Sequence, residues 1–161
     1  MISSGAEWMN ASPTSVAGRV AALYVRLALA TAFLSAVADR FGGWGPPDSA
    51  GVAWGDFGRF LSYTGSLVPF LPPDGVAALG WVVTIAEILL GISLLFGLRV
   101  REAAVGSAIL LLGFALGMMV GDGVKAPFDA SVFSASAGAL LLYAHPKSFW
   151  SLDAVFLSRS G

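Results

Sequence analysis

The sequence contains no cysteine and a single histidine, His145. The absence of cysteine excludes disulfides, thiolate nucleophiles, cysteine-ligated iron–sulfur clusters and covalently attached c-type haem within the chain. One histidine cannot supply both axial ligands of a bis-histidine haem. We therefore predict no metal site and no cofactor held by the chain's own ligands. Any redox cofactor should be soluble, carried by a partner, or borne by the lipid, as a quinone is.

Charged residues are also scarce. They make up 12% of the 161 residues, whereas 57% are hydrophobic and the formal net charge is -1. The mean hydropathy is +0.79. A nucleic-acid partner is not expected, because such partners call for a basic surface. An ordinary soluble domain has about 25% charged residues, so this composition predicts an integral membrane protein whose main partner is the lipid bilayer.

Apolar runs divide the chain. A helix needs about 20 apolar residues to cross a bilayer, and candidate spans lie at about 16–38, 77–98, 103–120 and 131–144. The first run is long and is interrupted by Arg26, unlike the compact core of a signal peptide. We predict an all-α protein in which residues 16–145 form a transmembrane four-helix bundle, preceded by an N-terminal tail at 1–15.

Residues 41–75 form a long connection rich in glycine, proline and aromatic residues. Apolar side chains recur at helical spacing from Phe57 to Val68, which predicts a short amphipathic helix in the membrane interface. This helix either caps the outer end of the bundle or rests on the membrane surface, and both interpretations stay open. Residues 146–161 follow a His-Pro pair that should end the fourth helix. They are predicted to form an amphipathic tail on the membrane.

Basic residues predict the orientation in the membrane, because cytoplasmic loops carry an excess of lysine and arginine. With both termini inside, the cytoplasmic segments hold Arg19, Arg99, Arg101, Lys147 and Arg159, and the outer segments hold Arg40, Arg59 and Lys125. We therefore expect both termini to be cytoplasmic, in a membrane of the bacterial inner-membrane type.

Glu87 lies halfway along the second apolar run, where an ionised side chain costs at least ~2.5 kcal/mol. Arg26 is the other ionisable residue deep in a run. Counting from the run ends places Arg26 roughly 12 Å and Glu87 roughly 15 Å from the cytoplasmic surface. We expect the two to pair, since an arginine and a carboxylate can share two hydrogen bonds, with Thr84 near Glu87. The pair either handles a ligand headgroup or proton, or it only fixes helix register. In a third interpretation the Arg26 side chain snorkels toward the membrane surface beside a protonated Glu87.

Gly113, Gly117 and Gly121 recur every fourth residue in the third run. Such a ridge of small residues lets a neighbouring backbone approach closely, so we predict a role in helix packing. Asp39 and Arg40, at the outer end of the first run, are interpreted as ordinary surface residues. The sequence has no Ser/His/Asp set, metal-ligand spacing or phosphate loop, so no catalytic residue is assigned.

Four groups of short motifs, in order along the chain, resemble the DoxX/DoxD-like membrane proteins. They are Arg26-Leu27-Ala28-Leu29 with Phe33-Leu34-Ser35-Ala36, Ala38-Asp39-Arg40-Phe41-Gly42 with Trp54-Gly55-Asp56-Phe57, Glu87-Ile88-Leu89-Leu90-Gly91, and Trp150-Ser151-Leu152-Asp153. The resemblance implies a four-helix membrane bundle. Some relatives are described as subunits of a thiosulfate:quinone oxidoreductase and others as membrane partners of redox enzymes. This chain departs from the family by having Ala36 where glycine is common, and its lack of cysteine makes thiol-based sulfur transfer within it unexpected.

These features predict a membrane subunit that supports quinone-linked electron transfer. In this hypothesis Arg26 and Glu87 form a buried polar site where Glu87 exchanges a quinol proton; whether the chain itself is catalytic stays open. The alternative is a non-catalytic accessory or structural subunit packed against a larger membrane-protein complex. A small transporter or channel is less favoured, because the predicted spans have few polar residues to line an aqueous path.

Overall fold

The computed structural model describes residues 15–145, which form helices and contain no strand. The helices are α1 (Val16–Arg40), α2 (Phe57–Leu67), α3 (Pro73–Phe96), α4 (Val100–Gly121), α5 (Ala126–Asp129) and α6 (Val132–Ala144). Three of them, α1, α3 and α4, are long and apolar enough to cross a membrane. The all-helical, membrane-type architecture predicted from the sequence is thus confirmed. The two predicted tails and the motif at 150–153 lie outside the described residues.

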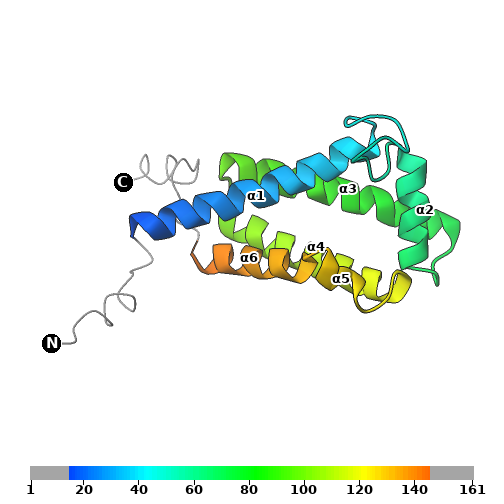
Figure 1. Ribbon diagram of the computed structural model, residues 1–161. Helices are drawn as coiled ribbons and strands as arrows, with labels where there is room; N and C mark the ends of the chain where they lie inside the picture. Colours follow the sequence, from blue (N-terminus) through cyan, green and yellow to red (C-terminus); the bar gives the residue numbers. More distant parts are fainter. Residues whose placement is uncertain (1–14, 146–161) are drawn as a thin grey trace.

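The fourth apolar helix is shorter than the other three. Helix α6 has 13 residues, which corresponds to about 20 Å at the standard helical rise. The hydrocarbon layer of a bilayer is about 30 Å thick. Helix α6 alone is therefore shorter than a full span, and the short helix α5 precedes it at the same end of the molecule as α2 (Figure 1).

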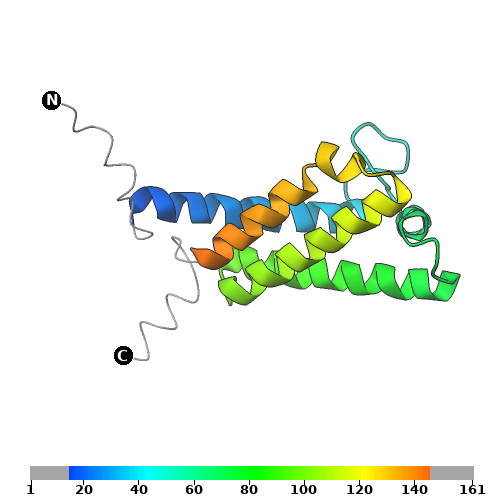
Figure 2. The same cartoon turned by 90° about the horizontal axis from the view of Figure 1, so that it is seen from below.

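The long helices form two layers (Figure 1). Helices α1 and α3 run antiparallel in one layer, and α4 packs along α6 in the other. Seen from below, α4 and α6 cross the first layer obliquely (Figure 2). Helix α2 lies across one end of the bundle and contacts α1, α3 and α4. The opposite end carries the start of α1, the turn between α3 and α4, and the end of α6.

Local sequence signals set the helix ends. The Ser15 side chain accepts a hydrogen bond of 3.1 Å from the Gly18 amide and caps α1, while Asp56 caps α2 by accepting one of 2.9 Å from the Arg59 amide. Helix α3 begins at Pro73, four residues earlier than predicted, because proline fits the first helical position. It ends at Phe96 and is capped by Gly97, whose φ of 68° lies in the left-handed region that glycine adopts without strain.

The closely packed core occupies the end of the bundle away from α2. Its buried members come from the middle of α1, the end of α3, the first half of α4 and the end of α6. They are mostly small or aliphatic side chains: Ala22, Leu29, Ala30, Phe33, Leu94, Val100, Ala103, Ala104, Ala108, Ala139 and Leu142. Small side chains let the helices approach closely here. The half of the bundle nearest α2 is packed differently and contains the candidate site.

The outer faces of the long helices are apolar. Large aliphatic side chains such as Val82, Leu89, Leu116 and Leu140 leave more than half of their surface exposed. A soluble monomer rarely exposes apolar patches of this extent. The exposed apolar faces, together with three helices of sufficient length, indicate that the protein resides in a membrane.

Candidate functional site: a buried ion pair on an apolar cavity

Arg40 and Glu87 form an ion pair inside the bundle. Arg40 is the last residue of α1 and Glu87 lies in the second half of α3, and each side chain is 2% exposed. Arg40 Nη1 contacts Glu87 Oε2 and also donates a hydrogen bond of 2.9 Å to Thr84 Oγ1. The Thr84 hydroxyl in turn donates to the Gly80 carbonyl at 2.7 Å. These contacts join α1 to α3 through one compact polar cluster.

Aromatic rings cover the guanidinium of Arg40. Its central carbon lies 3.9 Å from the centre of the Phe60 ring and 5.5 Å from the centre of the Trp54 ring. Trp54 and Phe60 themselves meet edge to face, with ring centres 5.4 Å apart. A cation over an aromatic face gains electrostatic stabilisation that is larger where water is excluded. The loop before α2 and α2 itself therefore close the α2 end of the ion pair.

Asp39 positions the loop that carries Trp54. One carboxylate oxygen, Oδ2, accepts hydrogen bonds of 3.0 Å from the backbone amides of both Ala53 and Trp54. Asp39 is buried, so these charge-assisted bonds are shielded from water. Consecutive residues at the end of α1 thus have separate roles: Asp39 fixes the loop and Arg40 enters the site. The prediction that both are ordinary surface residues is wrong.

The predicted pairing of Glu87 with Arg26 is also wrong. A Cβ added at Gly91 of α3 would meet Leu34 within 3.0 Å and the Ala30 carbonyl at 3.5 Å. Because α1 and α3 are antiparallel, Glu87 therefore lies level with the α1 turn after Leu34, near Ala36. Arg26 comes ten residues before Ala36, roughly 15 Å away along the helix. Arg26 is buried nearer the start of α1, where it makes contacts of its own.

The error arises from the assumption that the helices begin and end at common levels. The first turns of α1 extend beyond the turn between α3 and α4 (Figure 1). Counting residues from the start of the first run therefore placed Arg26 too deep relative to Glu87. Thr84, in contrast, lies at the ion pair.

A cavity of about 570 Å³ adjoins the ion pair. This volume is within the range of ~300–1,000 Å³ that is typical of small-molecule sites. Arg40 and Glu87 both line the cavity, and most of the remaining wall is aliphatic or aromatic, contributed by Leu79, Val83, Leu110, Phe114, Met118 and Val132 among others. Arg40 Nε is buried and has no hydrogen-bond partner among residues 15–145. The cavity thus combines apolar walls with a charged pair.

The glycine ridge of α4 lies along this cavity. Gly121 and Gly117 face Leu67 of α2, and a Cβ added at Gly121 would meet the Ser66 carbonyl at 2.6 Å. These two glycines let α2 lie close to α4. Gly113 differs: a Cβ added there would meet nothing within 4 Å, and Gly113 lines the cavity. The predicted role in helix packing therefore does not hold for Gly113, which lies on the cavity wall.

Further contacts fix α2 as the cap over the cavity. Tyr63 Oη donates a hydrogen bond of 2.6 Å to Asp122 Oδ2 at the end of α4. Partial burial and this carboxylate acceptor raise the pKa of Tyr63 to about 12. On the other side, a Cβ at Gly80 of α3 would meet Leu61 at 2.4 Å, so α2 lies directly on α3. Of the two predicted positions for this helix, the cap over the end of the bundle agrees with these contacts.

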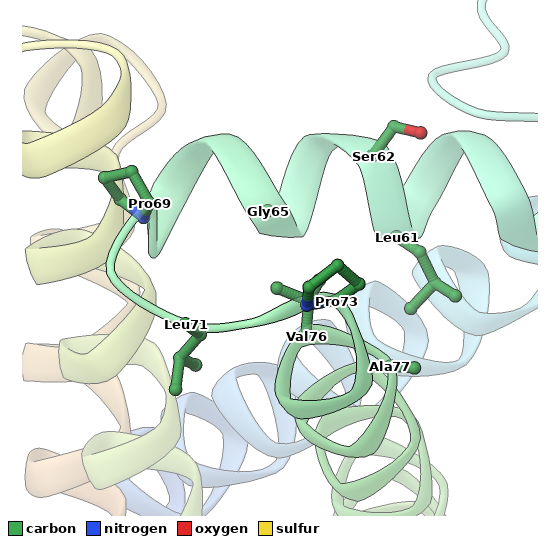
Figure 3. Close-up of a pocket in the computed structure, with 8 residues that line it drawn as sticks. All are labelled: Leu61, Ser62, Gly65, Pro69, Leu71, Pro73, Val76 and Ala77. Carbon is green, nitrogen blue, oxygen red and sulfur yellow. The ribbon is translucent and has the colours of Figure 1, made fainter.

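A second, smaller hollow lies where α2 crosses the start of α3 (Figure 3). It has a volume of about 440 Å³ and is lined by Leu61, Ser62, Gly65, Pro69, Leu71, Pro73, Val76 and Ala77. Pro73 and Val76 point from the first turns of α3 toward α2, and Ser62 points away (Figure 3). No charged side chain lines this hollow, so it offers no chemistry comparable with that of the ion-pair cavity.

Arg40 was missed by the sequence analysis, although a signal was present. Arg26, Phe33 and Arg40 are seven residues apart along α1, a spacing that places them on one face of a helix. All three are buried. An inward face that includes Arg26 must therefore include Arg40, and the offset between α1 and α3 along their axes decides which of the two meets Glu87. Trp54 gives no comparable signal, because its position depends on how the loop folds. Phe60 belongs to the apolar face predicted for α2, but its place over Arg40 depends on how α2 sits on the bundle.

Within the described part of the chain, no group of three or more histidine, aspartate or glutamate side chains is placed to hold a metal ion. No family model, curated protein or solved structure matches this chain.

Proposed function

We propose that this protein is a four-helix membrane subunit whose cavity binds a lipid-soluble quinone in support of quinone-linked electron transfer. The observation that carries the proposal is a buried ion pair on the wall of an otherwise apolar cavity. Buried charges are rare in membrane helices and mark ligand or proton sites by default. The resemblance to DoxX/DoxD-like proteins, among which are subunits of a thiosulfate:quinone oxidoreductase, points to the same ligand class.

The donors and walls of the cavity fit such a headgroup. Arg40 lines the cavity, and a quinone carbonyl is an acceptor suited to a guanidinium N–H. Because Glu87 already neutralises the guanidinium, an uncharged headgroup fits better than an anion. A bound quinone would supply two-electron, two-proton redox chemistry, with the electrons delivered by a partner oxidoreductase. Glu87 would hold or release a proton beside the headgroup, and Arg40 would stabilise its carboxylate.

The same proposal includes the membrane arrangement. Helices α1, α3, α4 and α6 cross the bilayer, with α6 extended by the segment around α5, and both termini lie on the cytoplasmic side of a bacterial-type inner membrane. Two basic residues at this end of the bundle support the orientation: Arg99 in the turn between α3 and α4, and Arg101 in the first turn of α4. The cavity and α2 then lie toward the outer surface.

A binding measurement in lipid nanodiscs tests the function. The purified protein is titrated with decylubiquinone, and binding is followed by quenching of tryptophan fluorescence. Arg40→Met should raise the dissociation constant by about tenfold or more, the loss expected for a hydrogen bond from a charged donor. Arg59→Met removes an arginine that pairs with Asp48 on the outside of α2 and should change nothing. Absence of saturable binding to the unmodified protein would refute the quinone role.

A second function, as an accessory subunit of a larger complex, is favoured by a different feature. A shallow groove of about 730 Å³ runs along the exposed face of α1 and is lined mainly by small residues, including Ala28, Ala32, Ser35 and Ala38, with Trp44 beside it. Small residues let a foreign helix approach closely in a membrane. Copurification of a stoichiometric partner that is lost in Ala32→Phe would support this function, and a partner that is retained would count against it.

A further inference from the structure

The cavity opens between α3 and α4. Gly106 and Gly113 lie seven residues apart on one face of α4. At Gly106 this face touches α3, since an added Cβ would lie 2.9 Å from Leu90, but at Gly113 it meets nothing within 4 Å. Helices α3 and α4 therefore separate between these two levels.

Two side chains locate the opening. Ile109 of α4 lines the cavity and yet leaves 66% of its surface exposed, so it lies at the rim. Val83 of α3 also lines the cavity, and its neighbour Val82 is exposed on the outer face. The rim is apolar and belongs to two helices that are long enough to cross a membrane. The opening therefore faces the hydrocarbon of the bilayer.

We infer that an isoprenoid-type quinone binds with its headgroup at Arg40 and its tail passing through this opening into the bilayer. We further infer that Gly113 determines which tails are accepted. The inference rests on the proposed function and adds the orientation of the ligand and the residue that selects it. With no side chain, Gly113 leaves room for an alkyl chain between α3 and α4. A larger side chain there closes the route and leaves the headgroup contacts intact.

Gly113→Leu tests the inference without endangering the fold. The added Cβ has free space, and leucine favours a helix more than glycine does. In nanodiscs, Gly113→Leu should weaken binding of decylubiquinone about tenfold and leave binding of the tail-less duroquinone within about twofold. The matched control is Leu112→Phe, which adds bulk at an exposed neighbouring position that does not line the cavity. Equal effects on both quinones, or no effect on either, would overturn the inference.

A second readout separates this inference from the proposed function. Nanodiscs are made with phospholipids brominated deep in the acyl chain, and the fluorescence of Trp54, which lines the cavity, is taken as the difference from Trp54→Phe. The open route predicts quenching of Trp54 that falls in Gly113→Leu and persists in Leu112→Phe. If Trp54 is quenched in this way but no quinone binds, the quinone function fails and the lateral route stands. If Trp54 is not quenched, protein closes the gap and the inference fails.

Discussion

Replacing Arg40 by methionine tests which arginine compensates Glu87. Both members of the pair are 2% exposed, so the replacement leaves a buried carboxylate without its cation. Breaking a buried ion pair by removing one partner costs about 3–5 kcal/mol. The hydrogen bond to Thr84 and the contact with Phe60 are lost as well. Because an unfolded chain in a membrane also finds partners for its polar groups, we expect Arg40→Met to lower the free energy of unfolding by about 3 kcal/mol.

A double-mutant cycle isolates the contribution of the pair. Arg40→Met combined with Glu87→Met leaves no uncompensated charge, and replacing a whole buried pair by apolar side chains is often neutral. The double variant should therefore be more stable than the sum of the two single effects by about 2 kcal/mol, near the upper end of couplings between contacting residues. The matched cycle uses Arg26→Met with Glu87→Met. These residues lie roughly 15 Å apart, so their effects should add within about 0.5 kcal/mol.

The free energies are measured by reversible unfolding in mixed micelles with increasing SDS, followed by far-ultraviolet circular dichroism. Every variant is compared with the unmodified protein in the same lipid and detergent. Coupling between residues 26 and 87, together with additivity between residues 40 and 87, would restore the pairing expected from the sequence. That result would also contradict the placement of the Arg40–Glu87 ion pair on the cavity wall.

Two further predictions concern the cap formed by α2. Gly121→Ala should destabilise the protein by about 1–3 kcal/mol, because its Cβ would meet the Ser66 carbonyl at 2.6 Å. Gly113→Ala, whose Cβ has free space, should instead stabilise the protein by about 0.5–1 kcal/mol. Unfolding in SDS measures both changes, and equal effects would contradict the packing described. Partial burial, together with the hydrogen bond to Asp122, raises the pKa of Tyr63 to about 12, so the stabilisation from this contact is complete below pH 10 and is lost as the pH rises through about 12. Absorbance at 295 nm should show one tyrosine titrating near pH 12 that is missing in Tyr63→Phe, and a titration near pH 10 would refute the contact.

The helices themselves follow closely from the sequence. Apolar runs of sufficient length predicted α1, α3 and α4, and the amphipathic spacing from Phe57 predicted α2. The observed helix boundaries differ from the predicted ones where a residue type is compatible with both a loop and a helix end. The sequence predicts a connection up to residue 75, but proline also fits the first position of a helix, and α3 begins at Pro73.

The site was only half predictable. An acid in the middle of an apolar run requires a partner, so Glu87 could be singled out from sequence alone. The identity of the partner depends on the vertical offset between α1 and α3, and periodicity within each helix says nothing about that offset. The offset is set by close contacts such as Leu34 against Gly91, which become visible only when the two helices are placed together.

The order Asp39-Arg40 explains how one helix end can serve both the loop and the cavity. Successive residues of an α-helix point about 100° apart, so Arg40 can face α3 while Asp39 faces the returning loop. Asp39 holds the amide of Trp54, and Trp54 lies over Arg40, so the loop and the charge are fixed by the same turn of α1. The return of the loop depends on glycine: Gly55 has a φ of 71°, and a Cβ there would meet the Pro47 nitrogen at 2.4 Å. A change in the loop therefore reaches the ion pair through Trp54, whose ring lies over Arg40.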